Sequence, residues 1–199
     1  LGAQSFRRYR GAAGNPAAGQ ARGGNDEADA TGSNPQATPI VVGGVMYLPA
    51  RGNQVLAIEA HTGKEIWRYL MPLGMATTAR GVAYWPGDGG LAPRILLTAG
   101  ARLVALDAST GAPATGFGRN GVVDIGVPWN GVPTIYRNIA ILGATTGEVA
   151  LGVPGDTRAF DIRTGKHLWD FHTVPLLGEP GHDTWLDHGW RNRSGVNVW

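Results

Sequence analysis

The side chains with the clearest potential for chemistry lie together in one polar stretch near the end of the sequence. His182, Asp183, Asp187 and His188 fall within seven residues, and imidazole and carboxylate groups are common ligands of zinc. Their spacing fits no standard metal site, and the surrounding residues have the polar composition of a loop. We therefore expect solvated loop residues here and no metal centre.

Three arginines near the start of the chain, Arg7, Arg8 and Arg10, could form a patch for an anionic surface. Residues 1–37 are rich in glycine, alanine and asparagine and carry little apolar periodicity, which is typical of an irregular, solvated arm. The net charge of +2 does not suggest a protein that binds nucleic acid. The chain has no cysteine, so disulfide and thiolate chemistry are excluded.

The elements that would position any site are marked by a repeated phrase. Residues 157–171, TRAFDIRTGKHLWDF, favour a strand, a tight turn and a second strand. Gly165 can take the positive φ that such a turn needs, and the Asp161 carboxylate can accept hydrogen bonds from the turn amides. The sequence therefore predicts a β-hairpin in this stretch.

Two further copies of the phrase occur at residues 57–69 and 105–117, with Gly63 and Gly111 at the place of Gly165. These glycines are 48 and 54 residues apart, a period typical of propeller blades or comparable stacked β units. Three ordinary hairpins in another all-β fold are the simpler alternative. We favour the repeat, because the flanking residues recur together with the turn.

The pattern predicts an all-β fold, a partial β-propeller of about three four-stranded antiparallel blades. The blades are expected at residues 38–70, 78–126 and 130–172, followed by a loop at 173–194 and the start of a further strand. The expected strands are 38–42, 45–49, 54–59 and 64–69 in the first blade, 81–85, 94–99, 102–107 and about 121–125 in the second, and 132–136, 139–142, 157–162 and 166–171 in the third.

Two tryptophans extend from the second strand of their hairpins, Trp67 and Trp169. An indole ring is too large to bury within one hairpin, so we expect both to pack between neighbouring sheets. Three blades cannot close a ring and would leave sheet edges and a docking face uncovered. The pattern therefore predicts part of a longer chain, with a small three-unit β-prism-like fold as the alternative.

The repeated phrase, Ala-x-Asp-x-x-Thr-Gly-x-x-x-Trp, is similar to the tryptophan-docking motif of quinoprotein dehydrogenases. The resemblance extends to ARGVAYWPGD at residues 79–88, GVPTIY at 131–136 and the stretches 155–175 and 181–199. These phrases look like the branch often called pyrroloquinoline quinone (PQQ)-dependent glucose dehydrogenases. The resemblance implies an eight-bladed propeller that holds PQQ and Ca²⁺, and the chain would supply an N-terminal part of it.

The resemblance also implies which residues would bind the cofactor. Arg80 matches the family arginine that pairs with a PQQ carboxylate, and Trp199, in Asn197-x-Trp199, matches the ring that lies under the quinone. Glu148 matches the carboxylate that touches both PQQ and Ca²⁺, which makes it the expected metal ligand. The remaining cofactor contacts would come from Asn130, Thr145, Thr146, Gly147 and Asn197.

The chain departs from one branch of the family just before Arg80. In that branch two adjacent cysteines form a disulfide over the quinone, whereas Thr77, Thr78 and Ala79 precede the arginine here. We therefore expect no disulfide lid in this protein. The family's general-base aspartate also lies beyond the matched stretch, so this chain alone is expected to be inactive.

The implied function is oxidation of an aldose or an alcohol, with electrons passed to a quinone or a cytochrome. The resemblance implies a periplasmic location, and association with the inner membrane only through parts outside this chain. The alternative is a non-catalytic PQQ-like repeat propeller that acts as a scaffold in outer-membrane assembly. Arg80, Glu148 and Trp199 favour the enzyme, because a scaffold has no need for a charged pair and a stacking ring at these places.

Overall fold

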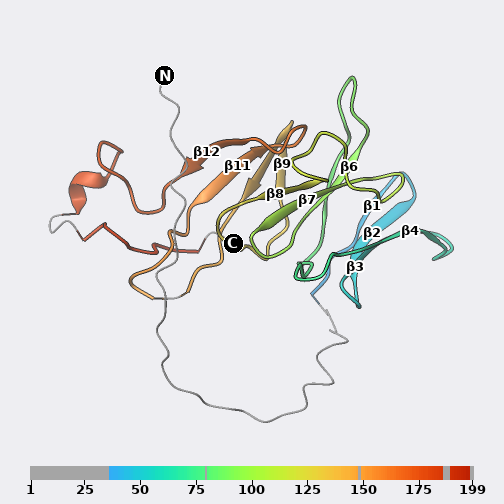
Figure 1. Ribbon diagram of the computed structural model, residues 1–199, viewed down its shortest axis with the longest axis horizontal. Helices are drawn as coiled ribbons and strands as arrows, with labels where there is room; N and C mark the ends of the chain where they lie inside the picture. The colour runs from blue at the N-terminus through green and yellow to red at the C-terminus, as the bar shows by residue number, and fades with distance from the viewer. Residues whose placement is uncertain (1–35, 79, 148, 186–188, 198–199) are drawn as a thin grey trace, which may run out of the picture.

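The computed structural model describes residues 36–78, 80–147, 149–185 and 189–197, and its strands form three antiparallel sheets of four strands each (Figure 1). The first sheet contains β1 (Ile40–Val42), β2 (Val45–Ala50), β3 (Gln54–Glu59) and β4 (Glu65–Leu70). The second contains β5 (Ala83–Trp85), β6 (Arg94–Thr98), β7 (Arg102–Asp107) and β8 (Val122–Asp124). The third contains β9 (Thr134–Tyr136), β10 (Ile139–Leu142), β11 (Thr157–Asp161) and β12 (His167–Phe171).

The all-β prediction is confirmed, and the strands lie close to their expected ranges. Three strands start two residues later than expected, because β1 begins at Ile40, β5 at Ala83 and β9 at Thr134. Gly81 pairs with Thr38 instead of joining β5. Pro133 has no amide to donate to a sheet ladder, so β9 begins after it.

The three glycine turns of the repeat have the same backbone geometry. Gly63, Gly111 and Gly165 have φ values of 74°, 73° and 76°, which is the left-handed region that favours glycine. Each glycine amide donates to the carbonyl oxygen four residues earlier, at 2.8, 2.9 and 2.8 Å respectively. The Asp161 carboxylate accepts from the amides of Arg163 and Thr164, as the sequence predicted.

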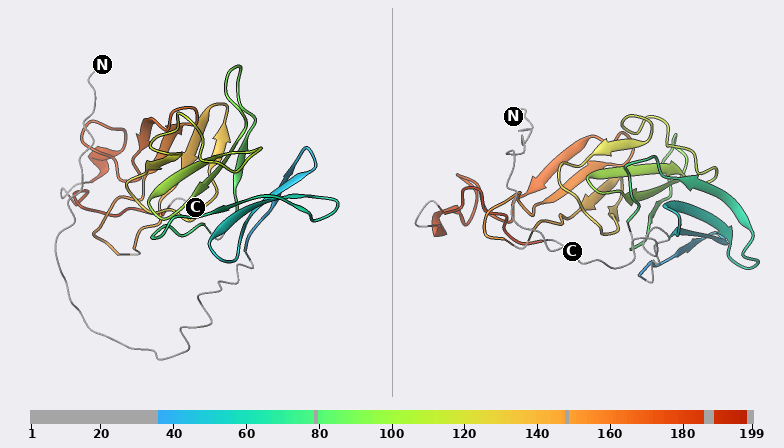
Figure 2. Two further views of the ribbon diagram at one scale, coloured as in Figure 1. Left: turned by 45° about the vertical axis from the view of Figure 1, so that its right-hand side comes forward. Right: turned by 60° about the horizontal axis from the view of Figure 1, so that its bottom comes forward.

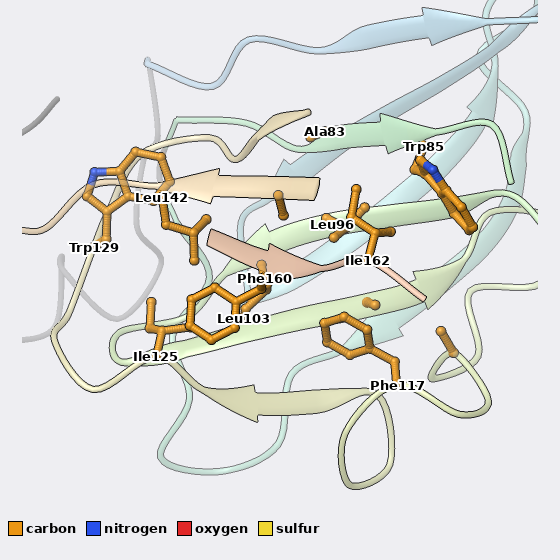
Figure 3. Close-up of a cluster of buried hydrophobic side chains, with 13 residues drawn as sticks. Ala83, Trp85, Leu96, Leu103, Phe117, Ile125, Trp129, Leu142, Phe160 and Ile162 are labelled. Carbon is orange, nitrogen blue, oxygen red and sulfur yellow. The ribbon is translucent and has the colours of Figure 1, made fainter. Parts of the chain in front are cut away.

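The second sheet lies between the other two and is apolar on both faces (Figure 2). On β6, Leu96 belongs to the core shared with the third sheet, while Ile95 and Leu97 belong to the core shared with the first. A strand that is covered on both sides carries apolar residues on both of its faces, which explains the continuous run ILL at the centre of β6. Figure 3 shows the core between the second and third sheets, with Phe117 and Trp85 at one end and Trp129 and Leu142 at the other.

The first and second sheets are joined by Trp67, as predicted. Its side chain is 8% exposed, and its indole Nε1 donates to the Ala108 carbonyl oxygen at 2.9 Å. The ring covers the turn glycine Gly111, where an added Cβ would lie 2.5 Å from the Trp67 ring. The absence of a side chain at Gly111 is therefore what admits the tryptophan.

The second and third sheets are joined differently, because the second copy of the phrase has no tryptophan. Phe117 and Val123 cover Gly165 instead, and an added Cβ at Gly165 would lie 2.4 Å from Val123 Cγ1. Phe117 is fully buried. The Arg94 guanidinium lies 5.9 Å from the Phe117 ring centre and donates to the carbonyl oxygens of Ile162 and Arg163.

The prediction for Trp169 is wrong in this structure, because its side chain is 41% exposed. Trp169 lies on β12 at the outer face of the third sheet, with Leu168 and Phe171 exposed beside it. In the part of the chain that the structure describes, no fourth sheet follows to cover this face. The predicted irregular arm, residues 1–37, lies outside the described residues except for its last two positions.

Replacing Gly111 with alanine should lower the free energy of unfolding by about 3 kcal/mol. A positive φ costs alanine about 1–2 kcal/mol, and displacing the Trp67 ring adds an overpacking cost of about 1–3 kcal/mol. Urea denaturation of the purified protein measures the change.

The matched control is Gly63→Ala, since Gly63 has nearly the same φ but no atom within 4 Å of the added Cβ. This control should lose only the backbone cost of about 1–2 kcal/mol. Equal losses in the two variants would show that the packing of Trp67 on Gly111 contributes nothing.

Candidate functional site

The sheets have two structurally different ends. The glycine turns of the repeat lie at one end, which we call the docking end. Because antiparallel hairpins alternate direction, the loops at residues 71–82, 125–133 and 143–156 all lie at the other end, which we call the loop end. Every sequence-predicted site residue that the structure describes lies in these loops or in residues 189–197.

Arg80 and Asn130 lie in neighbouring loops of the loop end, and both are exposed. The buried Thr78 links the two loops, because its hydroxyl donates to the Asn130 carbonyl oxygen at 2.5 Å. The same hydroxyl accepts a hydrogen bond from the Arg80 amide at 3.2 Å. The two predicted residues therefore lie close together, although fifty positions separate them in the sequence.

Thr146 and Asn197 are in direct contact. Asn197 Oδ1 accepts hydrogen bonds from the Thr146 amide at 2.6 Å and from its hydroxyl at 2.7 Å. Asn197 Nδ2 donates back to the Thr146 carbonyl oxygen at 3.2 Å. The preceding residue, Thr145, is half-buried, and its amide donates to the Pro128 carbonyl oxygen at 2.7 Å. Two predicted site residues from distant parts of the sequence are thus held as a pair.

The segment that carries Asn197 lies along the loop between β10 and β11. The Gly152 amide donates to the Asn192 carbonyl oxygen at 2.9 Å, and the Gly155 amide donates to the Ser194 carbonyl oxygen at 2.7 Å. Gly155 has no room for a side chain, since an added Cβ would lie 2.1 Å from the Val196 carbonyl oxygen. Residues 189–197 are therefore held by backbone hydrogen bonds along the loop at residues 143–156.

Several predicted residues lie outside the described residues or take no part in the loop end. Glu148 and Trp199 lie outside the described residues, although their neighbours Gly147 and Asn197 do not. His182 lies in the short helix η1 (His182–Thr184), donates to the Pro175 carbonyl oxygen at 3.1 Å and packs edge-on against Trp190. Asp187 and His188 also lie outside the described residues, and the structure brings no group of three metal-ligating side chains together within the part that it describes.

Residues 17–199 match the family described as the PQQ glucose/ethanol/alcohol dehydrogenase β-propeller domain. The chain belongs to this family. The match identifies the three sheets as propeller blades, which excludes the β-prism alternative and confirms the resemblance seen in the sequence.

Relatives within this family are named for two kinds of activity, oxidation of alcohols and oxidation of glucose. The chain is 31% identical to the dehydrogenase subunit of alcohol dehydrogenase (quinone) from Gluconobacter oxydans, over 85% of this chain and 25% of that protein. It is also 31% identical to quinoprotein glucose dehydrogenase from the same organism, over 74% of this chain and 22% of that protein.

A solved structure shows the same arrangement of sheets. The quinohemoprotein alcohol dehydrogenase from Comamonas testosteroni matches 69% of this chain and 21% of its own, with 30% identity and a TM-score of 0.54. The chain spans about a quarter of the length of the two curated relatives named above.

The sequence analysis missed Arg158, a buried residue of β11 whose guanidinium links the loop at residues 125–133 to the loop at residues 143–156. Its side chain points into the core, is 7% exposed, and donates to the carbonyl oxygens of Ile125, Val127 and Gly143. The first two acceptors belong to the loop that carries Asn130, and Gly143 begins the loop that carries Thr145. The alternation of residues on β11 did not single out Arg158, because Thr157 and Asp161 on the same strand are polar as well.

Burial dominates the electrostatics beneath the loop end. Burial lowers the pKa of the Arg158 guanidinium, and the nearby carboxylates of Asp170 and Asp156 oppose that shift. Burial also raises the pKa of the Asp156 carboxyl, although its hydrogen bond from the Thr173 amide acts in the opposite direction. A cation held among carbonyl oxygens at this depth stabilises the loops chiefly by satisfying their backbone acceptors.

Replacing Arg158 with methionine should lower the free energy of unfolding by about 2–4 kcal/mol, because it leaves buried carbonyl oxygens without a donor. Arg158→Lys should recover only part of the loss, since an ammonium group cannot reach three carbonyls in fork geometry. Chemical denaturation measures both changes, and amide hydrogen exchange should show faster exchange at Thr145.

Arg102→Met is the control, because Arg102 is an exposed arginine whose ion pair with Asp124 spans 3.2 Å. That change should alter the free energy of unfolding by no more than about 0.5 kcal/mol. A loss in Arg158→Met that is no larger than this would contradict the role assigned to Arg158.

Proposed function

We propose that this chain is part of a PQQ-dependent dehydrogenase that oxidises an alcohol or an aldose. The observation that carries the proposal is the contact between Thr146 and Asn197, together with the neighbouring Arg80 and Asn130 at the same end of the sheets. These four residues come from loops of different blades, and propeller proteins bind ligands where such loops meet. The family match supports PQQ as the proposed ligand.

The residues at the loop end have the donor set that PQQ requires. PQQ is a flat quinone with three carboxylates, which call for a guanidinium and for hydroxyl and amide donors. Arg80 is exposed at this end and would pair with one carboxylate. Among the described residues, Asn197 uses one N–H of its side-chain amide on Thr146, and we propose the second N–H as a donor to PQQ.

Glu148 is the proposed ligand of Ca²⁺ from this chain, and it follows directly on Thr146 and Gly147. Ca²⁺ takes about six to eight oxygen ligands, so Glu148 would share the ion with PQQ and with groups supplied elsewhere in the protein. Trp199 is proposed to lie against one face of the quinone, since it follows Asn197 by two residues.

When bound, PQQ would accept the hydride that leaves the hydroxyl-bearing carbon of the substrate. The residues of this chain would hold and orient the cofactor, with Arg80 neutralising a carboxylate and Thr145, Thr146 and Asn197 fixing its edge. Both alcohols and aldoses are proposed as substrates, since relatives of both kinds are equally identical to the chain. A quinone or a cytochrome is the proposed electron acceptor.

We propose a periplasmic location, on the basis of the family resemblance. None of the helices in the described ranges is long and apolar enough to cross a membrane. Association with the inner membrane, if the whole protein has it, is assigned to segments other than these sheets.

Changing Glu148 to alanine in the complete gene product should abolish Ca²⁺-dependent reconstitution of activity with PQQ. The reason is the loss of a carboxylate ligand to the ion. Dye reduction with ethanol and with glucose, after addition of PQQ and Ca²⁺, measures the effect and reports the substrate class at the same time.

Arg80→Ala should weaken PQQ binding about tenfold or more, because a charge-assisted hydrogen bond is lost.

Arg137→Ala is the control, since Arg137 is an exposed arginine in the turn between β9 and β10, at the docking end. It should leave PQQ binding unchanged. A complete gene product that takes up no PQQ in equilibrium dialysis would overturn the proposal and favour the scaffold alternative.

A further inference from the structure

We propose that Thr78 is a positioning residue for the candidate site, through which the Arg80 backbone is coupled to the loop that carries Asn130. Thr78 would fix the point at which the Arg80 guanidinium meets a carboxylate of PQQ, without touching the cofactor itself. This inference rests on the proposed function, since it concerns the same site.

The first observation is that Thr78 is buried and that its hydroxyl both donates and accepts a hydrogen bond. Its side chain is 2% exposed, and a buried hydroxyl needs partners to offset its desolvation. The hydroxyl donates to the Asn130 carbonyl oxygen at 2.5 Å and accepts from the Arg80 amide at 3.2 Å. One oxygen atom therefore joins the two loops that carry two of the proposed cofactor contacts.

The second observation is that the backbone of Arg80 is held on both sides while its side chain is exposed. The Arg80 carbonyl oxygen accepts a hydrogen bond from the Thr38 amide at 3.0 Å. The next residue, Gly81, is enclosed, because an added Cβ would lie 2.9 Å from the Thr38 carbonyl oxygen and 3.2 Å from Val132 Cγ2. A surface arginine with a purely solvating role requires no such support, whereas a guanidinium that must meet a fixed carboxylate does.

The third observation is that a neighbouring threonine provides a matched comparison. The Thr98 hydroxyl donates to the Gly131 carbonyl oxygen at 3.0 Å, and Thr98 is fully buried. Thr98 also accepts at its backbone carbonyl the hydrogen bond from the Thr78 amide, at 2.9 Å. Thr98 thus supports the same loop with the same kind of bond, but the Arg80 amide donates to the Thr78 hydroxyl and not to that of Thr98.

The experiment measures PQQ binding to the complete gene product by equilibrium dialysis, with Ca²⁺ present. Thr78→Val keeps the shape of the side chain and removes the hydroxyl, so it should weaken PQQ binding about tenfold. Thr78→Ser, which keeps the hydroxyl, should bind PQQ about as well as the unmodified protein. Thr98→Val should lose similar stability in urea denaturation, with less than about a threefold change in PQQ binding.

A double-mutant cycle with Arg80→Ala separates positioning from general destabilisation. If Thr78 acts through Arg80, Thr78→Val should have no further effect on PQQ binding once Arg80 is alanine. If Thr78→Val fails to fold, Thr78→Ala and Thr78→Ser form the comparison, because the hydroxyl again distinguishes them.

Three results would overturn the inference. Unchanged PQQ binding in Thr78→Val, while the unmodified protein binds PQQ, would exclude the positioning role and leave the proposed function intact. The same loss in both backgrounds of the cycle would assign Thr78 a structural role only. Absence of PQQ binding to the unmodified protein would remove the proposed function, and the positioning role with it.

Discussion

The arrangement of this structure depends on the packing of a large side chain against a glycine turn of the next sheet. Gly111 must adopt a left-handed conformation and must also lack a Cβ, because the Trp67 ring occupies the space where that atom would lie. Only glycine meets both requirements. The contact fixes the position of one sheet on the next, and the same rule at Gly165 fixes the third.

The loop end is held together by a different kind of interaction from the docking end. Loops lack the ladder bonds of a sheet, so the carbonyl oxygens that they bury need donors from side chains. Among the described residues, Thr78, Thr98, Arg158 and Ser194 are buried donors of this kind. Thr78 and Thr98 bond carbonyls of the loop at residues 125–133, Arg158 bonds that loop and Gly143, and Ser194 bonds the Val149 carbonyl. The loop end is therefore held by buried polar groups, while Arg80 in the same loops is exposed.

The strands and the three turns could be predicted from the sequence because their causes are local. Alternation of apolar residues and a glycine with positive φ act within one hairpin. Trp169 and Arg158 could not be read in this way, because their surroundings depend on a neighbouring sheet. Trp169 has no sheet to cover it within the described structure, whereas Arg158 lies under loops from two blades. The closeness of Thr146 and Asn197 followed from the family resemblance rather than from any local pattern.

The second and third sheets keep their contact at Gly165 although the second copy of the repeated phrase has no tryptophan. Where a tryptophan would cover Gly165, the chain has Phe117 and Val123, whose nearest atoms would lie 3.4 and 2.4 Å from a Cβ added at Gly165. The buried Arg94 guanidinium fills the remaining space beside Phe117 and Trp85 and bonds backbone carbonyls of the third sheet. Removing a docking tryptophan is thus compatible with the blade spacing, provided that another group both fills the volume and satisfies the turn carbonyls. Because this spacing also sets the distance between the loops at the opposite end, we expect the link from Arg80 through Thr78 to Asn130 to depend on contacts at the docking end.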